Sequence, residues 1–147
     1  MAKRKSFFLF CKGKDVNIIF LQETHSKVED ITFWSKQCFF SHGTSRSAGV
    51  AILMKNLKGQ VISHVADANG HWLILILTHD DVKFILINIY GYRSTENKNL
   101  LEQISLQLDN IKSTYSTDKV IMNINVLLDS LQVIQTTPLL TSAMIKA

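Results

Sequence analysis

The chain has 147 residues, 46% of them hydrophobic and 19% charged, a composition that excludes a disordered chain and indicates one globular domain. Its net charge of +4 is compatible with a polyanionic partner without requiring one. Its two cysteines have no CxxC spacing and no apolar run is long enough to span a membrane, which excludes a disulfide scaffold and a zinc–cysteine site. We therefore expect a soluble, intracellular protein.

The first quarter of the chain predicts helix, strand and helix in turn. Apolar residues after a basic lead predict a short helix over residues 3–11, which Gly13 ends. Residues 16–21 read VNIIFL, a nearly continuous apolar run rich in β-branched residues that is typical of a strand buried on both faces. Glu23 follows at the carboxyl end of this strand, where sites are often built. Apolar residues three apart then predict a helix over residues 27–37.

The middle of the chain predicts a series of strands separated by short polar links. The predicted strands span residues 38–41, 48–54, 60–66, 72–78 and 82–90. Links this short favour antiparallel pairing, because a parallel crossover needs about a dozen residues or more. The runs WLILILT and FILINIY are apolar on both faces, so we expect the sheet to be covered on both sides.

The last third predicts one long helix and one further strand. Apolar residues recur at helical spacing through residues 96–113, and residues 119–125 (KVIMNIN) have the pattern of a buried strand. The remaining residues show no clear period. The order of elements predicts a single layered α+β domain over residues 1–147.

Three ordered runs resemble a known family. IIFLQETH, SRSAGVAIL, and LINIYGY with a long helix and KVIM after it occur in the order and approximate spacing of the endonuclease/exonuclease/phosphatase domain of LINE-type (non-LTR) retrotransposons. The resemblance covers residues 3 to about 129 and leaves residues 130–147 as a divergent tail. It implies a layered β-sandwich flanked by helices. We expect it to be incomplete at both ends, because the family's first strand and its closing Ser-Asp-His strands have no match here.

The resemblance implies a Mg²⁺-dependent endonuclease that cleaves DNA phosphodiesters. On this basis Glu23 matches the metal-binding glutamate, and Mg²⁺ does favour carboxylate oxygens. Tyr90 matches the tyrosine that contacts the scissile phosphate region, and Asn88 precedes it on the same strand face. Without the resemblance, Glu23 is typical of a solvated residue at the end of a strand. Tyr90 is then typical of a core aromatic residue that ends a buried strand with its hydroxyl at the rim of the core. For Tyr92 two interpretations are left: a side chain that faces solvent, or one that faces a DNA groove.

The strand after the long helix departs from the family pattern. The family has Gly-Asp-x-Asn there, whereas this chain reads VIMNINVLLD. The preferred alignment places Asn123 at the aspartate and Asn125 at the asparagine, and a shifted register places Asn125 and Leu127 there instead. Either way a neutral amide replaces the carboxylate, and a general-base contribution of about 10² to 10⁴ in rate is lost. Asp129 is predicted to be a turn or capping residue.

The histidines and one polar loop offer few further candidates. The histidines have no metal-ligand spacing and are predicted at the surface or rim; they are His25, His42, His64, His71 and His79. His25 is predicted close to the metal but not as an oriented base. Arg46 and the serines around it are candidates for phosphate contact, although a plain hairpin connection is the favoured interpretation.

Three functions stay open on the sequence. An active nuclease follows from the resemblance but lacks the catalytic aspartate and histidine. A non-catalytic remnant would at most bind nucleic acid weakly, and a retrotransposon fragment would have no selected function. We expect an impaired endonuclease domain with Mg²⁺ and DNA as ligands, no small-molecule cofactor and no membrane association. A nuclear location follows from the family alone, and the oligomeric state is left open.

Overall fold

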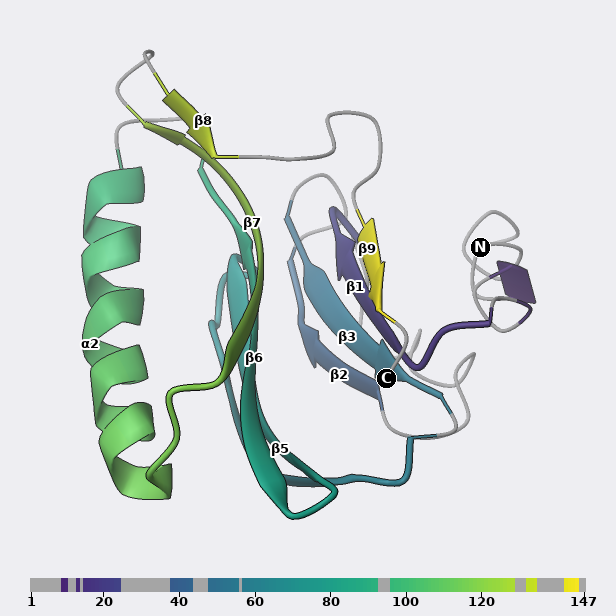
Figure 1. The fold of residues 1–147 in the computed structure, drawn as a ribbon. Helices are drawn as coiled ribbons and strands as arrows, with labels where there is room; N and C mark the ends of the chain where they lie inside the picture. The colour runs from purple at the N-terminus through teal and green to yellow at the C-terminus, as the bar shows by residue number, and fades with distance from the viewer. Residues whose placement is uncertain are drawn as a thin grey trace.

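The computed structural model describes residues 9–10, 13, 15–24, 38–43, 48–55, 57–92, 96–128, 132–134 and 142–145. Two β-sheets lie face to face, and one helix packs on the outer side of the second sheet (Figure 1). The predicted helix over residues 27–37 lies outside the described residues. Of the predicted helix over residues 3–11, only Leu9 and Phe10 are described, and both are helical.

The first sheet has the strand order β2-β3-β1-β9, and every pair in it is antiparallel. Its strands are β1 (Ile18–Gln22), β2 (Cys38–Ser41), β3 (Val50–Met54) and β9 (Ser142–Ile145). The first three confirm strands that the sequence predicts. β9 comes from the tail, for which the sequence predicts no element, and it pairs with the edge of β1 that β3 leaves open. β1 is therefore an interior strand.

The second sheet has the strand order β4-β5-β6-β7-β8. Its strands are β4 (Gln60–Ala66), β5 (Trp72–His79), β6 (Val82–Tyr90), β7 (Val120–Leu128) and β8 (Gln132–Ile134). β6 and β7 are parallel, and helix α2 (Asn97–Tyr115) forms the crossover between them. The predicted long helix and the strand after it are both confirmed.

One predicted pairing is wrong. The short link over residues 55–59 suggested that β3 and β4 pair antiparallel, but β3 belongs to the first sheet and β4 to the second. β3 already has β1 and β2 on its two edges, so it has no free edge for a further strand. The link therefore carries the chain from one sheet to the other.

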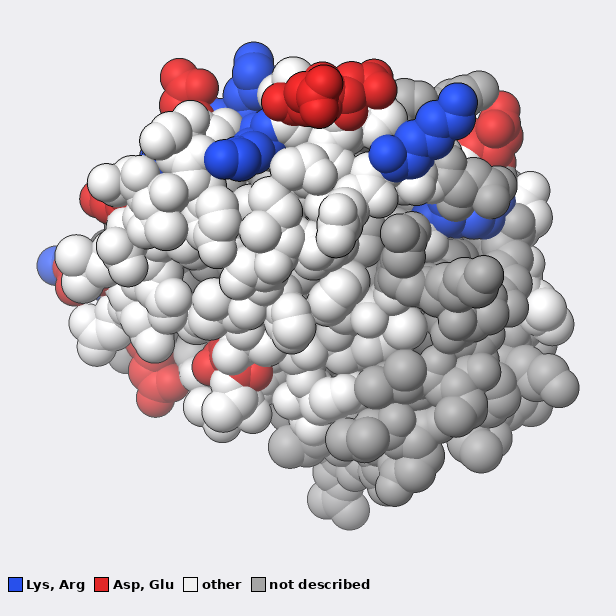
Figure 2. Space-filling view, turned by 90° about the horizontal axis from the view of Figure 1, so that it is seen from below, with Lys and Arg blue, Asp and Glu red and all other residues white. Residues whose placement is uncertain are grey.

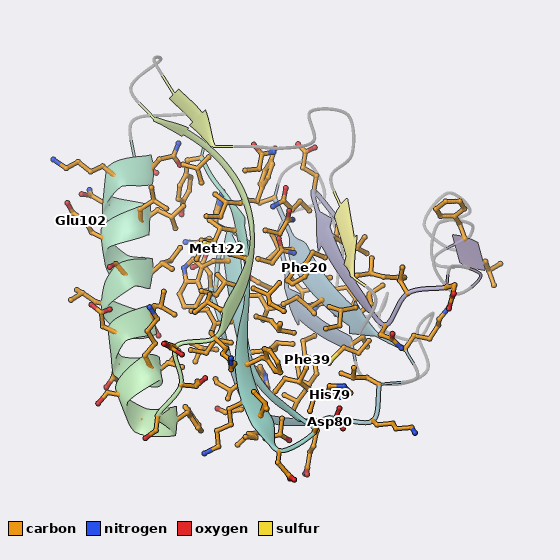
Figure 3. All side chains as sticks on the ribbon, viewed as in Figure 1. Phe20, Phe39, His79, Asp80, Glu102 and Met122 are labelled. Carbon is orange, nitrogen blue, oxygen red and sulfur yellow. The ribbon has the colours of Figure 1, made fainter. Side chains whose placement is uncertain are left out.

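Alternation along the strands divides the apolar residues between two main layers of core. Leu86 and its neighbours on β5 face the first sheet, whereas Ile85, Ile87 and Ile89 face α2. Phe20 and Phe39 lie between the sheets, and Glu102 points away from the sheet on the outer side of α2 (Figure 3). β5 and β6 are covered on both faces, as the sequence predicts.

Candidate functional site

Three strands bring the predicted site residues to the same end of the sandwich. β1, β6 and β7 all run toward that end, which is uppermost in Figure 1. Glu23 follows β1 directly, and Tyr90 is the last residue of β6. In the parallel register of β6 and β7, Asn88 lies opposite Asn123 and Tyr90 lies opposite Asn125. The structure thus gathers residues that are far apart in sequence.

Glu23 and Tyr90 are in direct contact across the two sheets. The Tyr90 phenol donates a hydrogen bond to Oε1 of Glu23. Glu23 has a φ of 52°, a left-handed conformation that costs a non-glycine residue about 1–2 kcal/mol. The backbone N–H of Thr24 donates to the Gly49 carbonyl at 3.0 Å. This turn and its bond fix the position of the carboxylate at the end of β1.

A buried network of amide side chains lies directly below this pair. Asn88 is fully buried, and its Nδ2 donates to the Leu21 carbonyl at 2.8 Å and to the Ala51 carbonyl at 3.0 Å. Its Oδ1 accepts from Gln22 Nε2 and from Asn123 Nδ2, both at 3.1 Å. Asn88 therefore bonds at all four of its positions and joins the two sheets.

Backbone carbonyls fix the orientation of every amide in this network. The Leu21 and Ala51 carbonyls can only accept, so the nitrogen of Asn88 must face them. Gln22 Nε2 also donates to the Ile89 carbonyl, at 2.8 Å. Asn88 Oδ1 consequently faces only donors, and Asn123 must supply an N–H to it. An ionised aspartate at position 123 has no proton to supply.

His71 is a component of the site that the sequence analysis missed. It is predicted at the surface or rim, yet it is buried, with 9% of its surface exposed. Its ring nitrogen Nδ1 lies 2.6 Å from the Tyr90 carbonyl. Its ring stacks on that of Tyr92 with a centroid distance of 3.6 Å. No spacing or motif signals this, because the partners lie on another strand and on the segment that follows it.

Asn97 fixes the segment that follows β6. It is buried at the start of α2, where its Oδ1 accepts from the Tyr92 N–H at 2.6 Å and its Nδ2 donates to the Tyr92 carbonyl at 2.9 Å. Burial raises the pKa of the Tyr92 phenol, and the carboxylates of Asp67 and Glu96 raise it further, while a hydrogen bond with Asn69 lowers it. Tyr92 is thus a fixed, half-buried part of the site end and not a freely solvated side chain.

The other histidines that the structure describes do not join this cluster. His42 stacks on Phe40, and the exposed His64 contacts Phe39 from β4. His79 lies at the opposite end of the sandwich, beside the β5–β6 hairpin, with its Nε2 3.4 Å from Asp80 (Figure 3). Three sequence candidates lie outside the described residues: His25, Arg46 and Asp129.

The chemistry of the donor set around Glu23 fits Mg²⁺ only as a sparse site. Among the described residues, no group of three or more His, Cys, Asp or Glu side chains is placed to hold a metal ion. Glu23 contributes one carboxylate just after β1, which is half-buried and whose Oε1 accepts from the Tyr90 phenol. Mg²⁺ usually keeps several waters and takes one or two carboxylates, so Glu23 with waters is a sufficient but weak set of ligands.

The whole chain carries a net charge of +4. On the face seen in Figure 2, opposite the site, positive and negative side chains intermingle along one edge and do not separate by sign. No described helix is long and apolar enough to cross a membrane.

The fold has clear similarities among solved structures. The chain is similar to truncated TDP2 of Caenorhabditis elegans, with a TM-score of 0.53 and 17% identity over 82% of this chain and 52% of that one. It is similar to two further structures of TDP2 from the same organism, one of them of the selenomethionine protein, with TM-scores of 0.51 and 0.53 and 17% identity over 82% of this chain and 40% of those. This chain thus spans about half of those chains or less. No family model and no curated protein matches it.

Proposed function

We propose that this chain, whose fold is that of the endonuclease/exonuclease/phosphatase enzymes, is a retrotransposon-type DNA endonuclease domain that has lost efficient catalysis. The proposal has three parts: a Mg²⁺ ligand at Glu23, a phosphate contact at Tyr90 and a missing general base. The retrotransposon assignment rests on the runs IIFLQETH, SRSAGVAIL and LINIYGY in this order. The similarity to TDP2 is one of fold, and the proposed substrate class, a DNA phosphodiester, rests on the same three runs.

The contact between Glu23 and Tyr90 is the observation that carries the proposal. The half-buried carboxylate that follows β1 provides an oxygen ligand for Mg²⁺. The phenol beside it has a single O–H, which donates to Glu23 in this structure and would turn to a phosphate oxygen when DNA binds. When bound, Mg²⁺ would polarise the phosphate and stabilise the charge that develops on it. Glu23 would hold the ion, and Tyr90 would bind and orient the phosphate.

The state of Asn123 explains why catalysis would be impaired. An amide does not accept a proton from water near neutral pH, so Asn123 cannot act as a general base. One of its two N–H groups is also engaged, because it donates to Asn88 in the buried network. Asn125 lies opposite Tyr90 in the register and is the second amide at this end. These residues would position a phosphate without activating the attacking water.

Activity and metal binding can be tested separately. Purified protein should not nick supercoiled plasmid in the presence of Mg²⁺. Mn²⁺, used in place of Mg²⁺ because it can be followed spectroscopically, should bind weakly to the wild type, and Glu23→Gln should lose this binding. Glu102→Gln is the matched control, because that carboxylate is exposed on the outer face of α2. Nicking that Glu23→Ala abolishes would show an active enzyme. Equal Mn²⁺ binding by wild type and Glu23→Gln would contradict the assignment of Glu23 as a metal ligand.

DNA binding has its own test. Because the chain carries a net charge of only +4, we expect weak affinity that depends on its lysines and arginines. Contacts to phosphates release counterions, so affinity should fall steeply as the salt concentration rises. Measurements on a short duplex at several salt concentrations test this. Affinity independent of salt would exclude a backbone-contact mode.

A further inference from the structure

The hydrogen-bond ladder between β5 and β6 ends in an unusual way. The last regular pair is Trp72 with Ile89, so the next position places His71 opposite Tyr90. There the Tyr90 N–H donates to the His71 carbonyl at 2.7 Å, as in a regular antiparallel ladder. The N–H of His71, however, donates to Oδ2 of Asp67 at 3.0 Å. The backbone donor that would normally reach the Tyr90 carbonyl is therefore used elsewhere.

The imidazole of His71 takes the place of that backbone donor. Its Nδ1 lies 2.6 Å from the Tyr90 carbonyl oxygen. Since a carbonyl only accepts, Nδ1 must carry the proton, and Nε2 keeps its lone pair in the neutral ring. The His71 side chain thus makes the last hydrogen bond between the two strands. Its partner is Tyr90, the residue whose phenol donates to Glu23.

The same ring supports the segment that follows β6. It stacks on Tyr92, whose backbone N–H and carbonyl are both held by Asn97. His71 is buried, so it makes both contacts in a nearly fixed position. The backbone of Tyr90 is consequently held on one side by β7 and on the other by the carbonyl and ring of His71.

We propose that His71 is a positioning residue for Tyr90. Its Nδ1–H holds the Tyr90 carbonyl, keeps the end of β6 in the plane of the sheet and so directs the phenol to Glu23. A buried or half-buried carbonyl that loses its donor tends to move toward another partner, and such a movement at Tyr90 would carry the phenol away from the carboxylate. The functional meaning rests on the role proposed for Tyr90, but the positioning itself does not.

Two substitutions separate the hydrogen bond from the aromatic contact. His71→Asn keeps an N–H donor on a nitrogen bonded to Cγ, the position that Nδ1 has in histidine. It removes the ring that stacks on Tyr92. His71→Phe keeps a ring for that stacking and removes the donor. The hydrogen-bond proposal predicts that the Asn variant preserves the contact between Tyr90 and Glu23 and that the Phe variant loses it.

The contact is measured by NMR of protein labelled with ¹³C at Cζ of tyrosine, without metal or DNA. Tyr90→Phe assigns the Tyr90 signal, and Glu23→Ala gives its position without the carboxylate. We expect His71→Phe to move the signal to the Glu23→Ala position and His71→Asn to leave it near the wild-type position. A wild-type signal in His71→Phe, or an equally large shift in both variants, overturns the proposal.

A measurement on the wild type guards against a variant that fails to fold. Long-range ¹⁵N–¹H spectra of the imidazole rings, with His71→Asn to assign the signals, report which nitrogen carries the proton. We expect the Nδ1–H tautomer at His71, and an Nε2–H tautomer would overturn the proposal. Because neither measurement uses Mg²⁺ or DNA, the failure of the proposed function would leave both results standing.

Discussion

Tyr90 and Glu23, 67 residues apart in sequence, form a hydrogen bond from phenol to carboxylate. Each lies at the end of a strand in a different sheet. The bond therefore reports on the packing of the two sheets as well as on the candidate site. Substitutions at the two positions can be used to measure both properties.

Tyr90→Phe should lower the free energy of unfolding modestly. It removes one half-buried hydrogen bond to a carboxylate, which corresponds to about 1–2 kcal/mol. Urea unfolding measures the change. Tyr115→Phe is the matched control, since that phenol on α2 is also half-buried, and we expect a smaller effect there. Equal losses at the two positions would show that the bond to Glu23 contributes nothing to stability.

Asn88→Leu should be one of the most destabilising substitutions in the chain. It removes four hydrogen bonds at a residue with no exposed surface. Three of the partners left behind are buried and Asn123 is half-buried. Each unsatisfied buried group costs about 1–3 kcal/mol, so we expect a loss on the order of 3 kcal/mol or more. Asn110→Leu, on the exposed face of α2, should change stability little in the same urea titration. A tolerated Asn88→Leu would refute the network.

Asn123→Asp should destabilise the fold near neutral pH and should not restore nicking. The carboxylate would face Asn88 Oδ1 without a proton to donate, at a cost of about 1–3 kcal/mol. Such an environment raises the pKa of the new carboxyl in the folded state. The protonated form can donate, so the deficit should be smallest below the unfolded pKa of about 3.9 and should grow as pH rises through the folded pKa.

Unfolding of Asn123→Asp and wild type at several pH values between about 3 and 8 tests that prediction. A deficit that does not depend on pH would show that the side chain at position 123 is solvated and outside the network. Rescue of Mg²⁺-dependent nicking by this single change would show that the missing carboxylate alone limits activity.

Gly70→Ala should be poorly tolerated. Gly70 has a φ of +80°, and a Cβ there would lie 2.6 Å from Gly43 Cα and 2.8 Å from Gly49 N. The left-handed conformation alone costs alanine about 1–2 kcal/mol, and the backbone contacts leave no room to relax. Gly13→Ala is the control, because its nearest atoms are 3.5 Å away and its φ is not positive. Similar thermal stability of both variants would contradict the close packing of these loops.

Stability should decline at alkaline pH, partly through Cys38. Burial raises the pKa of its thiol above the ordinary value of 9.0, against a smaller opposing effect from a backbone hydrogen bond. The folded state then keeps the proton longer than the unfolded state does. The resulting stabilisation is complete below the unfolded pKa and is lost as pH rises through the folded pKa. Under reducing conditions, Cys38→Ala should show a shallower decline than wild type above about pH 9.

The sequence by itself determined most elements of the fold and part of the site. Apolar runs with β-branched residues marked β1, β5 and β6, and helical periodicity marked α2, because these signals depend only on neighbours along the chain. Strand alternation likewise placed Asn88 and Tyr90 on one face. The position of Glu23 after β1 followed from the same local pattern.

Only the tertiary structure decided how those elements meet. The crossing from β3 to β4 depends on which strand edges are already occupied, and the pairing of β9 with β1 depends on a tail without periodicity. The bond from Asn123 to Asn88 spans 35 residues, and that from His71 to Tyr90 spans 19. These contacts join residues on separate strands through the geometry of single polar atoms, for which a one-dimensional pattern carries no signal.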